Sequence, residues 1–298
     1  MSIRPPRLKP GDGIGIIAPA GPVTPSELTP GINLLISMGY DVQVSNHLYD
    51  QMHYLAGDDD SRSEDLHTMF GDQYIKAIFC ARGGYGTSRL LDKIDYHLVR
   101  DNPKIIMGYS DITALLLALY KETGLVTFHG PMVRELSQGQ DPDLIFGPFV
   151  SSASIVLDLA SGTTLVPGRA DGILLGGNLS LICHLVGTPF LPSLHNVVLF
   201  VEDKGESLYR IDRMLTHLRL TGLLNDLAGL IMGQFEDCGD LQTLERLFTD
   251  LGDVLNIPVC SGLPAGHGQK NITIPMGLPV ALDSINLKLA IQGCCVSG

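Results

Sequence analysis

Two features that this 298-residue sequence lacks narrow the classes to which the protein can belong. It has no apolar run that approaches the roughly 18 residues of a membrane-spanning helix, so we expect nothing to span a membrane. Positive charge is scarce, because 20 Lys and Arg stand against 32 Asp and Glu. The resulting net charge of -12 argues against nucleic acid or an anionic membrane surface as the main partner.

Metal-binding and export patterns are also missing. The six cysteines show no C-x-x-C or Cys/His ligand spacing, so we expect no metal site and reduced thiols. The N-terminus imitates a signal peptide, since Arg4, Arg7 and Lys9 precede an apolar stretch that ends at Ala18-Pro19-Ala20. This stretch is too short and is interrupted by proline and glycine, which favours a first strand instead. The cytoplasm is therefore the expected location.

The first half of the chain alternates strand-like and helix-like segments. Capping boxes at Thr24 and Ser61 predict helices that end near Gly39 and Gly71. Apolar runs with strand character lie at 13–18, 42–44, 75–81, 105–107 and 125–128. This alternation predicts a doubly wound parallel α/β sheet, in which ligands bind beyond the carboxyl ends of the strands.

The second half is less regular. Prolines, glycines and serines interrupt the pattern over 137–170, where one short strand is expected at Ile155–Leu159. Beyond it, short apolar runs separated by turns predict a smaller mixed α/β domain that is partly barrel-like. Because the length suits two domains, we divide the chain into an N-terminal domain at 1–150, a linker at 151–167 and a C-terminal domain at 168–298.

The clearest chemical signal is a serine at a sharp turn from strand to helix. The apolar run 105–107 leads into Gly108-Tyr109-Ser110-Asp111, and strong helix formers follow. Such a turn exposes the serine hydroxyl beside N–H groups that can stabilise an oxyanion. The match to the hydrolase pattern G-x-S-x-G is partial, because Ile112 occupies the position of the second glycine. An ordinary turn is the alternative, and the Asp111 side chain is expected to cap its own helix.

Three glycine-rich stretches offer further binding elements. Gly83-Gly84-Tyr85-Gly86 follows a buried strand, where glycines let a substrate approach the backbone N–H groups, although an ordinary turn fits equally well. Gly176-Gly177-Asn178 precedes a helix that Asn178 is expected to cap. The stretch 13–18 fits the dinucleotide pattern G-x-G-x-x-A, but its glycines begin a strand and Pro19 follows, so no dinucleotide cofactor is expected.

A serine nucleophile needs a base, and the base needs an orienting acid. Two of the nine histidines suit the role of base. His129 ends a parallel strand on the sheet edge that carries the serine, and His267 lies between two glycines in a loop. The residues alone leave this choice open. The pair Glu202-Asp203 at the end of a buried strand offers the acid, and a solvated charge at a strand end is the alternative.

Six motifs in a fixed order together identify a resemblance that extends from Lys9 to about Leu282. The motifs are Ala81-Arg-Gly-Gly-Tyr-Gly, Gly108-Tyr-Ser-Asp, His129-Gly-Pro-Met, Gly176-Gly-Asn, Leu199-Phe-Val-Glu-Asp and Gly266-His-Gly. In this order they resemble the L,D-carboxypeptidases, which are serine peptidases that trim muropeptides in peptidoglycan recycling. The microcin C immunity peptidases are relatives of that family.

The resemblance implies a Ser-His-Glu triad at Ser110, His267 and Glu202, and so favours one of the two histidines. It implies oxyanion donors at the backbone N–H of Asp111 and of the glycine loop, which we place at Gly84. It also implies a sheet domain similar to that of class I glutamine amidotransferases, a smaller second domain, no metal or other cofactor, and a homodimer.

The implied reaction is the release of a C-terminal D-alanine from murein tetrapeptides through an acyl-enzyme. Arg82 is expected to bind the substrate carboxylate as a bidentate pair, with a structural salt bridge as the alternative, and Asn178 is a further expected substrate-binding residue. A peptidyl-nucleotide antibiotic is the alternative substrate, which the absence of tryptophan disfavours. A non-catalytic ligand-binding protein on the same scaffold is a third possibility, against which the intact Ser, His and Glu argue.

Overall fold

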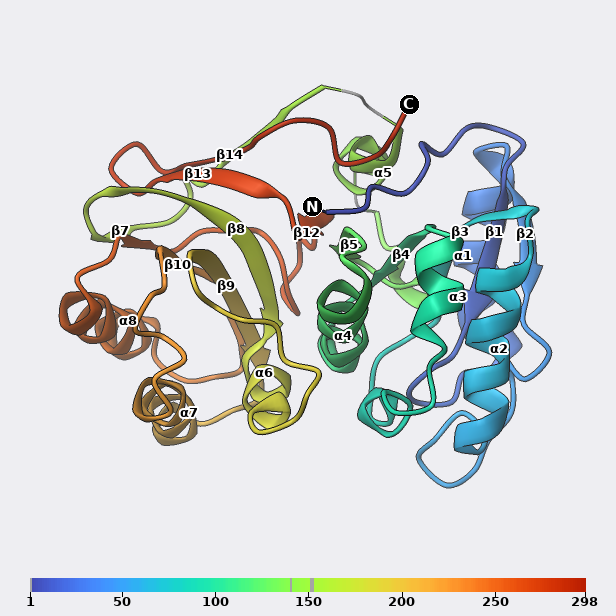
Figure 1. Cartoon of the computed structure of the whole chain (residues 1–298), viewed down its shortest axis with the longest axis horizontal. Helices are drawn as coiled ribbons and strands as arrows, with labels where there is room; N and C mark the ends of the chain where they lie inside the picture. The colour runs from blue at the N-terminus through green and yellow to red at the C-terminus, as the bar shows by residue number, and fades with distance from the viewer. Residues whose placement is uncertain (1, 140, 151–152) are drawn as a thin grey trace. The chain divides into compact units, whose positions relative to one another are not determined.

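The computed structural model describes residues 2–139, 141–150 and 153–298. The chain forms two compact units, each with its own sheet (Figure 1). The first unit comprises Met1–Ser152 together with the short segments Ile272–Pro275 and Cys295–Gly298. The second comprises Ala153–Asn271 and Met276–Cys294, so the chain passes between the units more than once.

The first unit is built on a six-stranded sheet with the strand order β12-β5-β4-β3-β1-β2. Strands β1 to β5 pair in parallel, as the sequence predicts. The strands are β1 (Gly13–Ile17), β2 (Asp41–Val44), β3 (Ile75–Cys80), β4 (Ile105–Gly108), β5 (Thr127–His129) and β12 (Ile274–Met276). The helices are α1 (Pro25–Ser37), α2 (Asp59–Gly71), α3 (Tyr96–Asp101), α4 (Thr113–Thr123) and α5 (Pro142–Val150), with 3-10 turns η1 (Thr87–Arg89), η2 (Ser110–Ile112) and η3 (Val133–Glu135).

Aromatic packing fixes helix α5 on one face of this sheet. Phe79, Met107 and Phe128 lie opposite one another on β3, β4 and β5. The ring of Phe149 in α5 lies 5.8 Å from that of Phe79 and 4.9 Å from that of Phe128. These rings are fully or almost fully buried. Near-continuous apolar strands are what a parallel sheet covered on both faces requires.

The strand order also determines where loops meet. The chain runs from β1 outward to β2 and then returns to β3 on the other side of β1. The switch point therefore lies between β1 and β3, and loops that leave the carboxyl ends of these strands form the usual ligand crevice of such sheets. The Gly83–Gly86 loop follows β3, and the serine turn follows the neighbouring strand β4.

The second unit contains an eight-stranded mixed sheet with the order β6-β14-β13-β8-β9-β10-β11-β7. The predicted mixed α/β character is confirmed. The sheet begins and ends with different strands, β6 and β7, so it is open and does not close into a barrel. Helices α6, α7 and α8 lie side by side along one face (Figure 1). The elements are β6 (Ile155–Asp158), β7 (Thr164–Val166), β8 (Arg169–Asn178), α6 (Leu179–Leu185), β9 (Val197–Lys204), α7 (Leu208–Leu220), β10 (Gly229–Glu236), α8 (Leu241–Leu255), β11 (Val259–Cys260), β13 (Pro279–Asp283) and β14 (Lys288–Ile291).

Helix caps follow the sequence in one case and depart from it in another. The capping box of Thr24 and Glu27 opens α1 as predicted. Helix α2 begins at Asp59, earlier than the predicted box at Ser61, because the carboxylate of Asp58 accepts the N–H of Ser61 at 2.7 Å. An Asp side chain caps a helix as well as Ser does, so the helix begins about one turn before the predicted position.

All six cysteines carry free thiols. Burial raises the pKa of Cys183 and of Cys260 to about 12, which keeps these thiols protonated and unreactive near neutral pH. Within the described ranges, none of the helices combines the length and the apolar character that crossing a membrane requires.

We predict that Gly31→Ala destabilises the protein although alanine normally favours a helix by about 1 kcal/mol. An ideal Cβ at Gly31 in α1 would lie 2.0 Å from the carbonyl oxygen of Val133 in η3, so the helix would have to shift. The free energy of unfolding should fall by about 1–3 kcal/mol, which urea denaturation would detect as a lower midpoint. Gly71→Ala at the end of α2 is the control, because its nearest neighbour lies at 4.0 Å and its midpoint should not fall. Equal effects of the two changes would contradict this packing.

Candidate active site

Ser110 adopts the backbone conformation expected of a nucleophile on a strand-to-helix turn. It lies two residues after the end of β4, opens η2 and precedes α4. Its φ is +61°, in the left-handed region that residues other than glycine rarely enter. Such a conformation costs of order 1–3 kcal/mol and persists only where the surrounding structure enforces it, which happens most often at functional sites. The predicted sharp turn is therefore confirmed at the level of the backbone.

The departure from the G-x-S-x-G pattern has a packing explanation. An ideal Cβ at Gly108 would lie 2.8 Å from Cγ2 of Ile112, so the isoleucine side chain packs directly against the first glycine. The first position of the turn must therefore remain glycine. The fifth position can hold a large apolar residue, because its side chain is buried in the first unit.

The glycine loop after β3 lies against the serine. An ideal Cβ at Gly83 would lie 3.1 Å from Cβ and 3.3 Å from Oγ of Ser110. Gly84 has a φ of +121°, which only glycine adopts readily. The loop is joined to the end of β1, since the N–H of Gly21 donates to the carbonyl of Gly83 at 3.2 Å. The glycine loop thus lies next to Ser110 and is hydrogen-bonded to the segment that follows β1.

Asp111 does not cap its own helix, which corrects the sequence expectation. Its carboxylate is 2% exposed and accepts the N–H and the hydroxyl of Thr87, both at 2.9 Å. Burial raises the pKa of Asp111, and the two hydrogen bonds from Thr87 oppose that rise. The side chain therefore joins the serine turn to the glycine loop. Its backbone N–H lies in the first turn of η2, where N–H groups have no intrahelical acceptor.

In the second unit, the predicted acid and base are hydrogen-bonded to each other. Glu202 lies at the end of β9 and is completely buried. Its Oε2 lies 2.7 Å from Nδ1 of His267. Because this contact engages Nδ1, Nε2 is the basic nitrogen of the neutral imidazole. This is the arrangement of base and orienting acid in serine hydrolases.

The loop around His267 is fixed on both sides. The N–H of Gly266 donates to Oδ1 of Asn271 at 3.1 Å, and the N–H of Gly268 donates to Oε1 of Gln234 at 3.0 Å. Gly266 has a φ of +123°, and an ideal Cβ there would lie 2.8 Å from Oε2 of Glu202. Glycine before the histidine is therefore needed for the close approach of the carboxylate.

The pair shifts the pKa of both members. Burial alone lowers the pKa of His267, but the hydrogen bond to Glu202 and the charge of that carboxylate outweigh burial and raise it. Burial also raises the pKa of Glu202, and its hydrogen bond to His267 acts in the opposite direction. The buried carboxylate therefore stabilises the imidazolium form, which a general base must form during catalysis.

The neighbouring carboxylate, Asp203, has a structural role. It accepts Nδ2 of Asn178 at 3.0 Å and the hydroxyl of Ser180 at 2.7 Å. Oδ1 of Asn178 accepts an N–H in the first turn of α6 at 3.1 Å, so the predicted helix cap is confirmed. Of the two adjacent acids, Asp203 thus holds helix α6 while Glu202 holds the histidine. A substrate contact by Asn178 stays a prediction.

The other expected residues lie in the first unit. His129 is 1% exposed at the end of β5, and its ring centroid lies 5.7 Å from that of Tyr109 in an edge-on arrangement. Nη1 of Arg82 donates to the carbonyl of Pro22 at 3.2 Å, so this contact is to the backbone and is not the salt bridge considered as the alternative. Among the residues that the structure describes, no group of three His, Cys, Asp or Glu side chains could hold a metal ion.

Ser110, with Gly84, Asp111 and Arg82, belongs to the first unit, whereas Glu202 and His267 belong to the second. The sequence did not identify two residues that contact the serine turn or the glycine loop: Thr87 contacts Asp111, and Gly21 contacts Gly83. The signal for Gly21 was its position after β1, because the strand order makes that loop part of the crevice. No local signal connects Thr87 to Asp111, which is 24 residues away.

Comparisons with known proteins extend over nearly the whole chain. The LD-carboxypeptidase N-terminal domain matches residues 14–130 and the LD-carboxypeptidase C-terminal domain matches residues 171–282. A probable murein peptide carboxypeptidase of Bacillus subtilis (strain 168) is 38% identical, covering 98% of this chain and 95% of that protein. The murein tetrapeptide carboxypeptidase of Pseudomonas aeruginosa is 32% identical, covering 94% and 96%.

A solved structure shares the fold. The crystal structure of an MccF-like protein from Bacillus anthracis superposes with a TM-score of 0.92 at 27% sequence identity. The superposition covers 98% of this chain and 100% of the other. The two matched domain models, the similar proteins and the shared fold point to the same family as the six sequence motifs. The chain belongs to the LD-carboxypeptidase family.

Proposed function

We propose that this protein is a serine-type L,D-carboxypeptidase that releases the C-terminal D-alanine of murein tetrapeptides. The observation that carries the proposal is the strained φ of Ser110 on a strand-to-helix turn, in a chain that also holds a buried Glu202–His267 pair. The names of the two murein peptidases among its relatives support the substrate class.

In this mechanism His267 takes the proton of Ser110 as the hydroxyl attacks the carbonyl next to the terminal D-residue. Glu202 holds the imidazole and stabilises its protonated form. The N–H groups of Gly84 and Asp111 stabilise the oxyanion, and each donor is expected to contribute about 3 kcal/mol. His267 then returns the proton to the departing D-alanine, and water hydrolyses the acyl-enzyme in the reverse sequence of steps.

The substrate's terminal carboxylate needs a cationic partner. Arg82 is our choice, because it adjoins the glycine loop in sequence and its guanidinium, with one N–H donated to Pro22, has further donors for a carboxylate. The same chemistry with a peptidyl-nucleotide substrate is the alternative, and the lack of tryptophan to stack on a base disfavours it. The cytoplasmic location expected from the sequence and the homodimer implied by the family resemblance are further parts of the proposal.

We predict that Ser110→Ala abolishes turnover and leaves folding intact. The loss should be about 10⁶-fold, as for removal of a serine nucleophile in other hydrolases. The assay is incubation with a defined set of muropeptides and a peptidyl-nucleotide, with products identified by mass. Ser37→Ala, an exposed serine at the end of α1, is the matched control and should keep full activity. A Ser110→Ala protein within tenfold of wild type would exclude this mechanism.

The two histidines can be separated by substitution. His267→Ala should reduce kcat nearly as far as Ser110→Ala, and the double variant should be scarcely worse, because members of a triad act as a unit. His129→Ala should cost much less and act through packing, since its ring is buried against Tyr109. Steady-state kinetics of the four variants decide the matter. The opposite ranking of the two histidines would make His129 the base.

The pH dependence tests the Glu202–His267 pair. The active base is the neutral imidazole, so kcat/KM should fall as pH drops through the pKa of His267, which the pair raises above the usual histidine value. Glu202→Gln removes the charge that favours the imidazolium, so the acidic limb should move to lower pH while the plateau also drops. An acidic limb that stays in place in Glu202→Gln would show that this carboxylate does not set the pKa of the base.

A further inference from the structure

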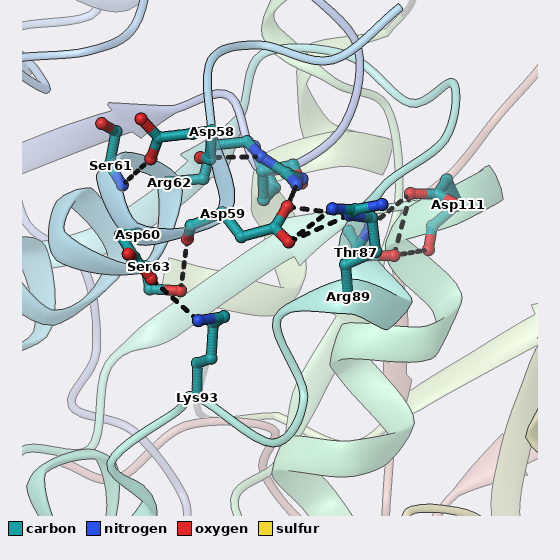
Figure 2. Close-up of polar contacts among 11 residues, drawn as sticks. Asp58, Asp59, Asp60, Ser61, Arg62, Ser63, Thr87, Arg89, Lys93 and Asp111 are labelled. Atoms are coloured by element: carbon teal, nitrogen blue, oxygen red, sulfur yellow. Dashed lines mark hydrogen bonds and ion pairs between the residues drawn. The ribbon is translucent and has the colours of Figure 1, made fainter.

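The glycine loop beside Ser110 rests on a network of polar contacts from helix α2 to the serine turn (Figure 2). We propose that Arg62, Arg89 and Thr87 are positioning residues, which hold the glycine loop (Gly83–Gly86) so that the N–H of Gly84 is presented to the oxyanion. This inference rests on the proposed function, because it concerns the same oxyanion site.

The loop needs external support because of its own composition. Gly84 and Gly86 have φ values of +121° and +138°. Glycine populates such conformations without a steric barrier, so the backbone alone does not select one arrangement. A misplacement of about 1 Å can cost about a hundredfold in rate, so contacts on either side of the loop are expected to matter for catalysis.

Arg62 packs against the end of the glycine loop at Gly86. Its side chain is 1% exposed, and its guanidinium donates to the carbonyl of Pro19 at 2.5 Å and to Oδ1 of Asp59 at 2.5 Å. An ideal Cβ at Gly86 would lie 2.5 Å from Nη1 of Arg62, so the loop backbone packs directly on the guanidinium. A buried cation is stable only when its donors are satisfied, and here the acceptors lie after β1 and in the first turn of α2.

Arg89 connects the same helix to the end of the loop. It lies in η1, three residues after Gly86, and donates from Nε at 2.9 Å and from Nη2 at 2.8 Å to the two oxygens of Asp59. The hydrogen bonds from Arg89 are the largest cause that lowers the pKa of Asp59. One carboxylate therefore bridges the buried Arg62 and the half-exposed Arg89 (Figure 2).

Thr87 connects the loop to the serine turn. It is completely buried, and its hydroxyl lies 2.5 Å from the carbonyl of Asp111 and 2.9 Å from its carboxylate. Its N–H donates to the same carboxylate at 2.9 Å. The residue that follows the loop is thus fixed to the residue that follows Ser110, which sets the spacing between the two proposed oxyanion donors.

The test compares four variants by kcat, KM and thermal stability. Thr87→Val keeps the shape and removes the hydroxyl, and should lower kcat by about ten- to a hundredfold with little change in KM. Thr87→Ser restores the hydroxyl and should recover most of kcat. Arg89→Ala, at a half-exposed pair, should lower kcat by up to about fivefold.

Lys93→Ala is the matched control. Lys93 forms a comparable exposed ion pair with the adjacent Asp60 of α2, at 2.8 Å, but lies beyond η1 and does not hold the loop (Figure 2). It should leave kcat unchanged. If Thr87→Val and Arg89→Ala match Lys93→Ala in kcat, or if Thr87→Ser is as impaired as Thr87→Val, the positioning role is excluded.

Hydrogen exchange of residues 83–86 separates this inference from the proposed function. In Thr87→Val and Arg89→Ala, the loop amides should exchange faster than in wild type and in Lys93→Ala. If wild type turns over none of the defined peptides, the proposed function fails while the exchange measurement still tests the support of the loop. Unchanged exchange in both variants would overturn the inference whatever the activity of wild type.

Discussion

The left-handed backbone of Ser110 is the constraint on which the candidate site depends. A conformation that costs of order 1–3 kcal/mol is retained only if neighbouring contacts leave no better alternative. Ile112 packs on Gly108 before the turn, and the carboxylate of Asp111 is bound to Thr87 after it. The turn is therefore held from both directions, and the hydroxyl is presented where the loops of the parallel sheet converge.

In the second unit, the main constraint is the burial of the Glu202 carboxylate. An isolated buried charge is strongly unfavourable, so Glu202 needs a partner that is itself fixed in position. His267 supplies it at 2.7 Å, and the positive φ of Gly266 allows the approach. The result is an imidazole with a raised pKa and a defined basic nitrogen. The two units thus each contribute one fixed part of the chemistry that we propose.

The sequence predicted the elements whose signals are local. The serine turn, the parallel strands of the first unit and the Asn178 cap were confirmed, because apolar runs, glycines and cap residues act within a few positions. The open eight-stranded sheet and the partner of Asp111 were not predicted. Both depend on pairing between distant segments, such as the contact of Asp111 with Thr87 across 24 residues, and periodicity carries no information about such contacts.

Two buried carboxylates, Asp111 and Glu202, lie next to the proposed catalytic groups, yet only one of them can assist a developing charge. Glu202 faces an imidazole that becomes positive, so its charge favours the reaction. Asp111 adjoins the proposed nucleophile, and its charge would oppose an oxyanion on the attacked substrate carbonyl unless it were compensated. Its hydrogen bonds from Thr87 and the positive charge of Arg62 both act on this carboxylate. The contacts that we propose to hold the oxyanion donors, from Thr87 and Arg62, therefore also offset the negative charge nearest to the serine turn.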